Sequence, residues 1–209
     1  SEKKNKSEYT WNRGNEDKSY PYLSKTLQKI LNKLKYKKKL LDIGCGNGSL
    51  TKILSKNFNL TFAIDTSNSA IYFAKKNNLK KVIFQVGSLQ LYQSKFKRNT
   101  FDTITAIEVI EHVYSPDLFL KDIKKIMNKK TNLIISTPFH GYFKNLLISI
   151  FGKFDDHFNP LWEHGHIKFW SVHTFKELLS RNGLKIKEIY FSGRFYPLSK
   201  SMIFLINLK

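Results

Sequence analysis

Cysteine is nearly absent from this chain of 209 residues, which contains only Cys45. One thiol excludes a disulfide framework within the chain and favours a reducing compartment, so we expect a cytoplasmic protein. Long apolar runs are also missing, because none approaches the roughly 20 residues that a transmembrane helix needs. The polar, lysine-rich residues 1–6 have no apolar segment behind them. The sequence therefore predicts neither a signal peptide nor a transmembrane segment.

Arginine is scarce although the chain is strongly basic. The formal net charge is +20, yet only four of the 36 basic residues are arginine. Proteins that read nucleic acid usually rely on arginine for bidentate contacts, so a solvated lysine surface is the favoured interpretation. A positive field also attracts anionic membrane surfaces. Nucleic acid therefore stays open as a partner without being favoured, and peripheral contact with a membrane stays open as well.

The order of strand and helix patterns predicts an α/β fold within one domain, residues 1–209. Strands are expected at Lys39–Ile43, Leu60–Ile64, Lys81–Val86, Thr103–Ile107, Asn132–Ser136, Leu184–Phe191 and Ser201–Leu208. Helices are expected at Tyr22–Leu34, Ser49–Asn57, Ser67–Asn77, Leu89–Tyr92, Pro116–Met127 and Val172–Arg181. Alternation of this kind gives parallel strands with right-handed crossovers, but no helix separates the last two strands. We expect a Rossmann-like, doubly wound, mostly parallel seven-stranded sheet with an antiparallel final strand and helices on both faces.

Two segments lie outside this alternation. Residues 1–38 form an N-terminal arm and helix, and the arm contains aromatic residues within Tyr9–Arg13. Residues 138–170 form an insertion, with a lid helix expected at Tyr142–Phe151. Its aromatic side chains with a few polar groups fit a pocket for a small ring or lipid-like molecule. The alternative is a small satellite core under a long loop.

The segment Leu40–Gly48, which reads Leu-Leu-Asp-Ile-Gly-Cys-Gly-Asn-Gly, carries the strongest functional signal. Gly44, Gly46 and Gly48 lack Cβ atoms, so the backbone can turn tightly and approach a ligand. A dinucleotide-binding loop prefers the spacing G-x-G-x-x-G, with a helix N-terminus aimed at a pyrophosphate. Here the spacing is G-x-G-x-G. Asp42, just before it, would repel a pyrophosphate but can hold an ammonium group.

A second acid stands at the end of the next predicted strand, in the segment Ile64-Asp65-Thr66. An acid at this position is placed to accept hydrogen bonds from both ribose hydroxyls of a nucleoside. The alternative is that Asp65 only caps the following helix. After the third predicted strand, Ser88 and Leu89 lie where an adenine ring would rest.

Two glutamates and a histidine follow the fourth predicted strand. Glu108 is three residues before Glu111 and four before His112, so in a helical turn all three side chains can point to one side. Two carboxylates and an imidazole can bind a divalent metal ion. The alternative is that Glu108 faces a cofactor, while Glu111 and His112 form hydrogen bonds that order the loop.

Together, Asp42–Gly48, Asp65 and Phe101–Val113 resemble the class I S-adenosylmethionine-dependent methyltransferases, over roughly Lys39 to Leu208. The resemblance implies that S-adenosyl-L-methionine is the cofactor. It places the methionine part against Asp42, Gly44, Cys45, Gly46 and Gly48, the ribose on Asp65 beside Thr66, the adenine beside Ser88 and Leu89, and Glu108 near the cofactor. Many relatives carry Asp where this chain has Ser88, so the adenine contact departs from the pattern.

The segment Glu-Val-Ile-Glu-His-Val is similar to the ubiquinone-biosynthesis O-methyltransferases and to the small-RNA 3′-terminal 2′-O-methyltransferases. In both groups the motif is associated with a divalent metal, and in the RNA enzymes a further histidine completes the site. The resemblance implies Mg²⁺ or another divalent cation on Glu108, Glu111, His112 and His166. Many methyltransferases carry Glu-His here without a metal, and in that case His140 or His166 is expected to act as the catalytic base.

We therefore expect an enzyme that methylates a small-molecule acceptor at a hydroxyl, such as that of a quinone precursor, a phenol or a sugar. The acceptor pocket is expected from Tyr9–Arg13 and the insertion. The alternative is an RNA 2′-O-methyltransferase, which the net charge and the Glu-Glu-His match favour. The scarcity of arginine counts against it, and 209 residues leave no room for a separate RNA-binding module.

Overall fold

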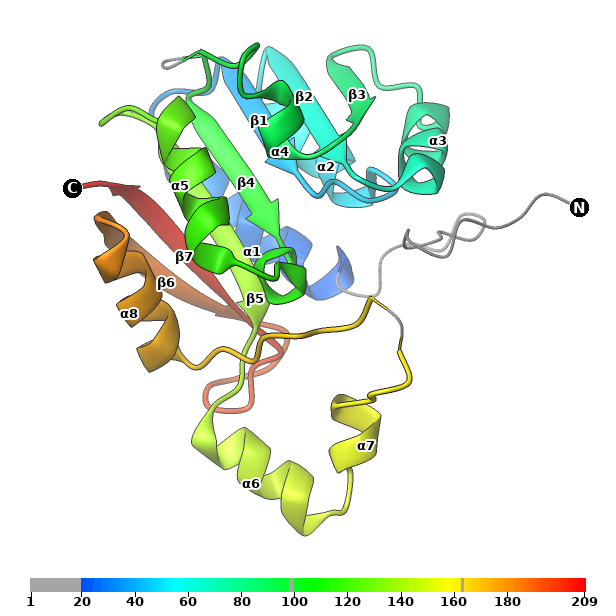
Figure 1. Cartoon of the computed structure of the whole chain (residues 1–209), viewed down its shortest axis with the longest axis vertical. Helices are drawn as coiled ribbons and strands as arrows, with labels where there is room; N and C mark the ends of the chain where they lie inside the picture. The colour runs from blue at the N-terminus through cyan, green and yellow to red at the C-terminus, as the bar shows by residue number, and fades with distance from the viewer. Residues whose placement is uncertain (1–19, 98–99, 163) are drawn as a thin grey trace, which may run out of the picture.

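A seven-stranded sheet forms the centre of the computed structural model, which describes residues 20–97, 100–162 and 164–209 (Figure 1). The strands are β1 (Lys39–Ile43), β2 (Leu60–Asp65), β3 (Val82–Val86), β4 (Thr103–Ile107), β5 (Asn132–Pro138), β6 (Leu184–Ser192) and β7 (Ser201–Leu208). Their order across the sheet is β3-β2-β1-β4-β5-β7-β6. Strands β1 to β5 pair in parallel, and β7 pairs antiparallel with β5 and β6. The predicted sheet, with its antiparallel final strand, is confirmed.

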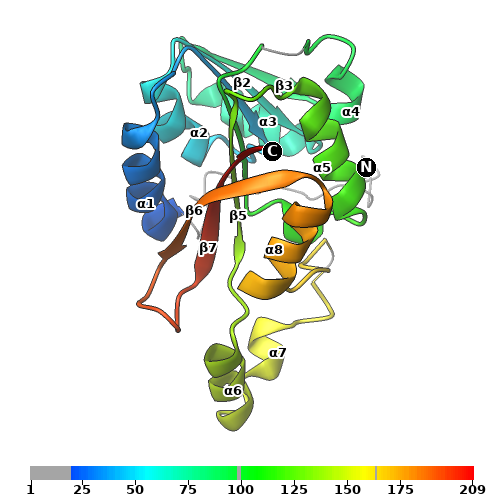
Figure 2. The same cartoon turned by 90° about the vertical axis from the view of Figure 1, so that its left-hand side faces the viewer.

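Helices cover both faces of the sheet, as expected. They are α1 (Tyr20–Lys33), α2 (Ser49–Leu54), α3 (Asn68–Lys76), α4 (Leu89–Tyr92), α5 (Pro116–Ile126), α6 (Tyr142–Ile150), α7 (Phe154–His157) and α8 (Val172–Arg181), with 3₁₀ turns at Ser55–Asn57 and Ile110–His112. Figure 2 shows α1 and α2 on one face and α5 and α8 on the other. Within the described residues, no helix is both long and apolar enough to cross a bilayer.

Apolar side chains at helical spacing form a core on each face. Leu23, Leu27 and Ile30 of α1 are fully buried and pack with Leu40 of β1. On the opposite face, α5 and α8 bury side chains such as Phe175 against the sheet. Burying a side chain of this size stabilises the fold by about 1.5–3 kcal/mol relative to leaving it exposed. The two cores fix the sheet between its helices, and the sheet in turn fixes the loops at its carboxyl edge.

The bounds of α4 and α8 match the sequence prediction, and those of the other predicted helices differ from it by one to three residues. The predicted helix Ser49–Asn57 divides into α2 and a 3₁₀ turn, and α1 begins at Tyr20 instead of Tyr22. The helix expected from Ser67 begins at Asn68, because the Ser67 hydroxyl accepts a hydrogen bond from the amide of Ala70 and so forms the N-cap. Such shifts are set by hydrogen bonds at the helix ends, which the periodicity of apolar residues does not report.

The insertion after β5 contains α6 and α7, which project beyond the sheet (Figures 1 and 2). The predicted lid helix Tyr142–Phe151 corresponds to α6, which ends one residue earlier. The segment after α7 returns along the carboxyl ends of the parallel strands and leads into α8 (Figure 1). Ligands of open parallel sheets bind at this edge. The N-terminal arm with Tyr9–Arg13 lies outside the described residues.

Candidate active site

The glycine loop after β1 adopts the backbone conformation that its glycines permit. Gly44, Gly46 and Gly48 have φ angles of +70°, +54° and +78°, in the left-handed region. A Cβ atom on Gly44 would lie 2.4 Å from a methyl group of Val109. The glycine therefore lets the loop after β4 pack directly on the loop after β1.

Asp42 is the buried residue of β1 that lies two residues before Gly44. Its side chain is 3% exposed, and its two oxygens accept hydrogen bonds from the hydroxyls of Thr51, at 2.6 Å, and Thr105, at 2.7 Å. Burial raises the pKa of Asp42 to about 6, although both hydroxyls oppose the rise. Asp42 thus places a buried carboxylate directly behind the glycine loop.

Asp65 lies at the carboxyl end of β2 and is held by two backbone amides. One oxygen accepts a hydrogen bond from Gly46, at 2.8 Å, and the other accepts one from Ser67, at 2.9 Å. The alternative that Asp65 caps the next helix is wrong, because Ser67 is the N-cap. Its bond to Gly46 ties the end of β2 to the glycine loop and fixes the carboxylate at the edge of a cavity.

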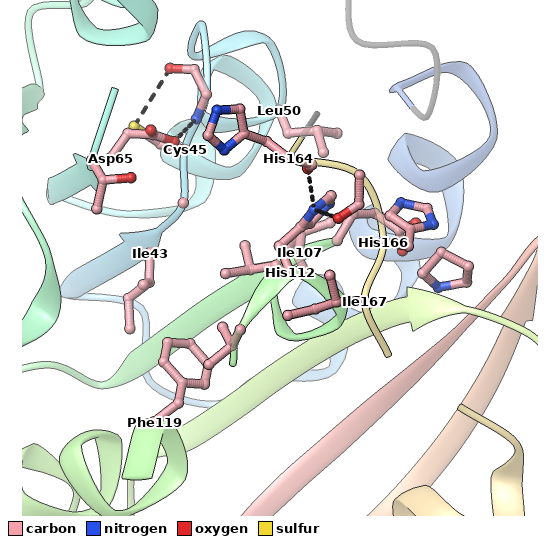
Figure 3. Close-up of a pocket in the computed structure, with 18 of the residues that line it drawn as sticks. Ile43, Cys45, Leu50, Asp65, Ile107, His112, Phe119, His164, His166 and Ile167 are labelled. Atoms are coloured by element: carbon pink, nitrogen blue, oxygen red, sulfur yellow. Dashed lines mark hydrogen bonds between the residues drawn. The ribbon is translucent and has the colours of Figure 1, made fainter. Parts of the chain in front are cut away.

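A cavity of about 1290 Å³ opens at the carboxyl edge of β1, β2 and β4 (Figure 3). It is lined by nine of the ten residues predicted to contact the cofactor: Asp42, Gly44, Cys45, Gly46, Asp65, Thr66, Ser88, Leu89 and Glu108. Gly48 is the exception, because it faces Ala74, Asn77 and Phe84. Burial raises the pKa of Cys45, so its thiol stays protonated and is a small wall residue.

Glu108 has a left-handed backbone conformation, with φ +54°, which is uncommon outside glycine. Its carboxylate accepts hydrogen bonds from the hydroxyls of Ser136, at 2.7 Å, and Ser201, at 3.2 Å. These contacts bind the loop after β4 to β5 and β7. Glu108 is predicted to be both a cofactor contact and a metal ligand, but its ligand atoms do not belong to the cluster that follows.

Glu111, His112 and His166 gather around one point. Their ligand atoms all lie within 4.8 Å of one another, and a Glu111 oxygen lies 4.0 Å from Nε2 of His166. The two segments meet because the amides of Ile167 and Lys168 both donate to the carbonyl oxygen of Glu111, each at 3.0 Å. Three of the four predicted metal ligands are therefore brought together.

The environment keeps this cluster suited to a metal ion. Nδ1 of His112 lies 3.0 Å and 3.1 Å from the carbonyl oxygens of His164 and Gly165, so it carries the proton and leaves Nε2 as the acceptor. Burial lowers the pKa of His112, and burial together with His112 lowers that of His166 to about 4. Both imidazoles are neutral near pH 7. A buried carboxylate and two neutral imidazoles could hold a divalent metal ion.

His140, the other predicted base, lies outside the cavity lining. Its ring packs against Phe158 and Phe169, with centroid distances of 5.4 Å and 5.2 Å. Burial and the charge of Lys144 lower its pKa to about 4. Its role as a base stays a prediction, and the geometry favours His166, which lines the cavity.

Several cavity residues were not singled out from the sequence. Asn47 lines the cavity beside the predicted glycines. Lys144 of α6 and three residues of the loop between β6 and β7, Arg194, Leu198 and Lys200, form part of the far wall. One lysine among many carries no positional signal. The long connection before the final strand likewise gives no hint that it returns to the edge of the sheet.

Comparison with known proteins decides the family. A family model described as a methyltransferase domain matches residues 16–189. The chain belongs to the class I S-adenosylmethionine-dependent methyltransferases. The predicted resemblance is confirmed, and S-adenosylmethionine is the cofactor of this family.

This methyltransferase is similar to two curated ubiquinone biosynthesis O-methyltransferases. It is 31% identical to that of Pelagibacter ubique over 156 residues, which cover 72% of the chain and 63% of the relative. It is 30% identical to that of Rickettsia canadensis over 171 residues, which cover 79% of the chain and 69% of the relative. The chain thus spans less than two thirds of the length of the first relative.

The fold also matches a solved structure. A SAM-dependent methyltransferase from Aquifex aeolicus aligns with a TM-score of 0.67 and 18% identity, covering 92% of this chain and 94% of that one. This likeness shows the Rossmann-like methyltransferase fold. It shows the fold alone and does not identify the methyl acceptor.

Proposed function

We propose that this methyltransferase transfers a methyl group from S-adenosylmethionine to a hydroxyl of a small aromatic molecule. The observation that supports the proposal most is that the cofactor residues and the possible metal ligands lie at opposite ends of a single cavity. The glycine loop and Asp65 line one end, and Glu111, His112 and His166 stand beside the other. The named activity of the two ubiquinone-biosynthesis relatives supports a hydroxyl acceptor with a phenolic ring.

The cofactor would lie along the carboxyl ends of β1 and β2. Asp65, oriented by the amides of Gly46 and Ser67, would accept hydrogen bonds from the ribose hydroxyls. Ser88 and Leu89 would contact the adenine, and the glycine loop above Asp42 would hold the methionine part. The sulfonium would then face Glu108 and the acceptor end of the cavity.

Methyl transfer is an in-line displacement: the methyl–sulfur bond breaks as the acceptor oxygen bonds to the methyl carbon, and the hydroxyl proton leaves. The protein contributes alignment and a way to remove that proton. Glu111, His112 and His166 would hold a divalent ion, which lowers the pKa of a bound hydroxyl. His112 is oriented for this role by the carbonyls of His164 and Gly165. Without an ion, neutral His166 would accept the proton itself.

The insertion offers a surface for peripheral contact with an anionic membrane. Tyr142, Phe143, Ile150 and Phe151 are 59–75% exposed, on or just after a helix that contains no acidic residue. Apolar side chains next to lysines favour an anionic lipid surface. Figure 2 shows α6 standing clear of the sheet. Sedimentation with anionic vesicles should deplete the wild type but not Phe143→Ser/Ile150→Ser, and equal sedimentation of both would exclude this contact.

RNA 2′-O-methylation finds no support among these relatives. The cytoplasmic location expected from the single cysteine stays a prediction. A direct test of the acceptor class compares catechol, aniline and a short RNA under the same conditions with S-adenosylmethionine. We expect turnover on catechol alone. Turnover confined to aniline or RNA would overturn the proposal.

A further inference from the structure

The acceptor end of the cavity is lined by cationic side chains from two separate segments. Lys144 and Lys153 come from the insertion, and Arg194 and Lys200 come from the loop between β6 and β7. His157 joins them from α7. Of the acidic residues that line the same cavity, Asp42 and Asp65 lie with the glycine loop at the other end, whereas Glu108 lies close enough to Lys144 to affect its pKa.

The cations are close enough to affect one another. Burial lowers the pKa of Lys144 to about 8; the charge of Glu108 opposes this, and the charges of Arg194 and Lys200 add to it. Burial and then Lys144 likewise lower the pKa of His157. Like charges held together cost free energy unless an anion lies between them. Glu108 supplies one negative charge near Lys144, and the three cations Lys144, Arg194 and Lys200 together favour a further negative group at this point.

Within the described part of the chain, no carboxylate forms an ion pair with Lys144, Lys153, Arg194 or Lys200. The Lys144 ammonium donates to the carbonyl oxygen of Phe139, at 2.8 Å, and Lys200 lies over the ring of Tyr22. Arg194 is one of only four arginines in the sequence. A generic lysine surface would not need one here, whereas bidentate binding of a carboxylate or phosphate does.

We propose that Lys144, Arg194 and Lys200 bind an acidic group on the methyl acceptor, a carboxylate or a phosphate. The inference rests on the proposed function and names its substrate class: a hydroxylated ring that carries a negative charge away from the hydroxyl to be methylated. The anion would sit between α6 and the β6–β7 loop and leave the hydroxyl toward Glu108 and His166. Charge at this site would select the acceptor as well as orient it.

Binding to protein saturated with S-adenosylhomocysteine tests this without turnover. Calorimetry at about 0.15 M salt compares 3,4-dihydroxybenzoate, 3,4-dihydroxyphenylphosphonate and neutral 3,4-dihydroxybenzamide. At least one anion should bind about tenfold or more tightly than the amide, as for one charge-assisted hydrogen bond. The preferred anion distinguishes carboxylate from phosphate. Lys144→Met and Arg194→Gln should each reduce the preference, and Lys52→Met, at an exposed lysine of α2 outside the cavity, should keep it.

Equal binding of the three probes would overturn the inference. So would a preference that survives in both variants, or one that is lost equally in Lys52→Met. If none of the rings binds, inorganic phosphate serves as the probe, and its failure to bind would also overturn it. Arg194 is exposed on the β6–β7 loop, so Arg194→Gln should fold normally. This variant keeps the test valid if Lys144→Met fails to fold. A charge preference in binding without methylation of any probe would count against the proposed function and leave this inference standing.

Discussion

The carboxylate of Glu111, which is fully buried, lies 4.0 Å from Nε2 of His166, a residue 55 positions later in the chain. This approach depends on the two amides that hold the segment after Gly165 against the carbonyl oxygen of Glu111. A divalent ion held by Glu111, His112 and His166 would place a positive charge beside this buried carboxylate. If Glu111 and His166 hold a metal ion at this point, methyl transfer should require that ion.

Chelation should abolish methyl transfer, and Mg²⁺ or Mn²⁺ should restore it. Glu111→Gln should lower kcat by about 100-fold or more, because a donor to the metal is lost. The dissociation constant for S-adenosylhomocysteine should change less than about threefold, because Glu111 does not line the cavity. Glu177→Gln, at an exposed site of α8, is the matched control. Full activity in chelator would refute the metal requirement and leave His166 as the base.

Asp65→Asn and Asp65→Ala should weaken binding of S-adenosylhomocysteine by about 10- to 100-fold. The carboxylate would accept from ribose hydroxyls, and it also holds the amide of Gly46. Asn keeps one acceptor oxygen, so its loss should be the smaller of the two. Calorimetry measures both constants. Unchanged affinity in Asp65→Ala would contradict the ribose assignment.

Asp42→Asn should alter the pH dependence of stability. The pKa of Asp42 is raised in the folded protein to about 6, against 3.8 for the ordinary group. The protonated form is thus favoured by folding, and its stabilising contribution is lost as pH rises from about 4 through about 6. The loss approaches about 3 kcal/mol, from 1.36 kcal/mol per pKa unit. The Asn variant lacks this loss.

The free energy of unfolding of Asp42→Asn, relative to the wild type, should therefore increase by about 2–3 kcal/mol between pH 4 and pH 7. Urea denaturation across that range measures it. Asp155→Asn, at an exposed carboxylate of α7, should show a far smaller change. A difference between Asp42→Asn and the wild type that does not vary with pH would contradict the burial argument.

Substitutions of the two candidate bases, His166 and His140, should affect kcat and stability differently. His166→Gln should lower kcat by about 50-fold or more, since His166 lines the cavity and approaches Glu111. His140→Gln should keep kcat within about threefold and lower stability by about 1–2 kcal/mol, because its ring packs against Phe158 and Phe169. Steady-state rates and thermal unfolding distinguish the two. The opposite pattern would make His140 the base.

The sequence allowed most of the fold and the cofactor end of the site to be predicted. Alternating apolar runs and helices determine a parallel sheet, and a glycine loop after its first strand must lie at the carboxyl edge. Asp65 lines the cavity, as expected of an acid at the end of a strand, and its contact with the ribose stays a prediction. Local spacing carries this information, so no tertiary contact had to be known.

The acceptor end could not be predicted in the same way. Lys144 and Arg194 meet only because the insertion and the β6–β7 loop return to one cavity, and neither loop has a periodic pattern. His140 follows β5 immediately, which made it a plausible base, but its ring packs among aromatic side chains of the insertion. Glu108 was grouped with Glu111 by its spacing and by the family resemblance, yet its carboxylate accepts hydrogen bonds from Ser136 and Ser201.

Methyl transfer to a hydroxyl oxygen can be read from the product itself. The purified chain is incubated with S-adenosylmethionine carrying a trideuterated methyl group, Mg²⁺ and 3,4-dihydroxybenzoate, and the products are examined by tandem mass spectrometry. The account predicts a labelled methyl ether on a ring oxygen, formed in step with S-adenosylhomocysteine. Label on carbon or nitrogen, or tight cofactor binding with no labelled product from any catechol, would contradict it.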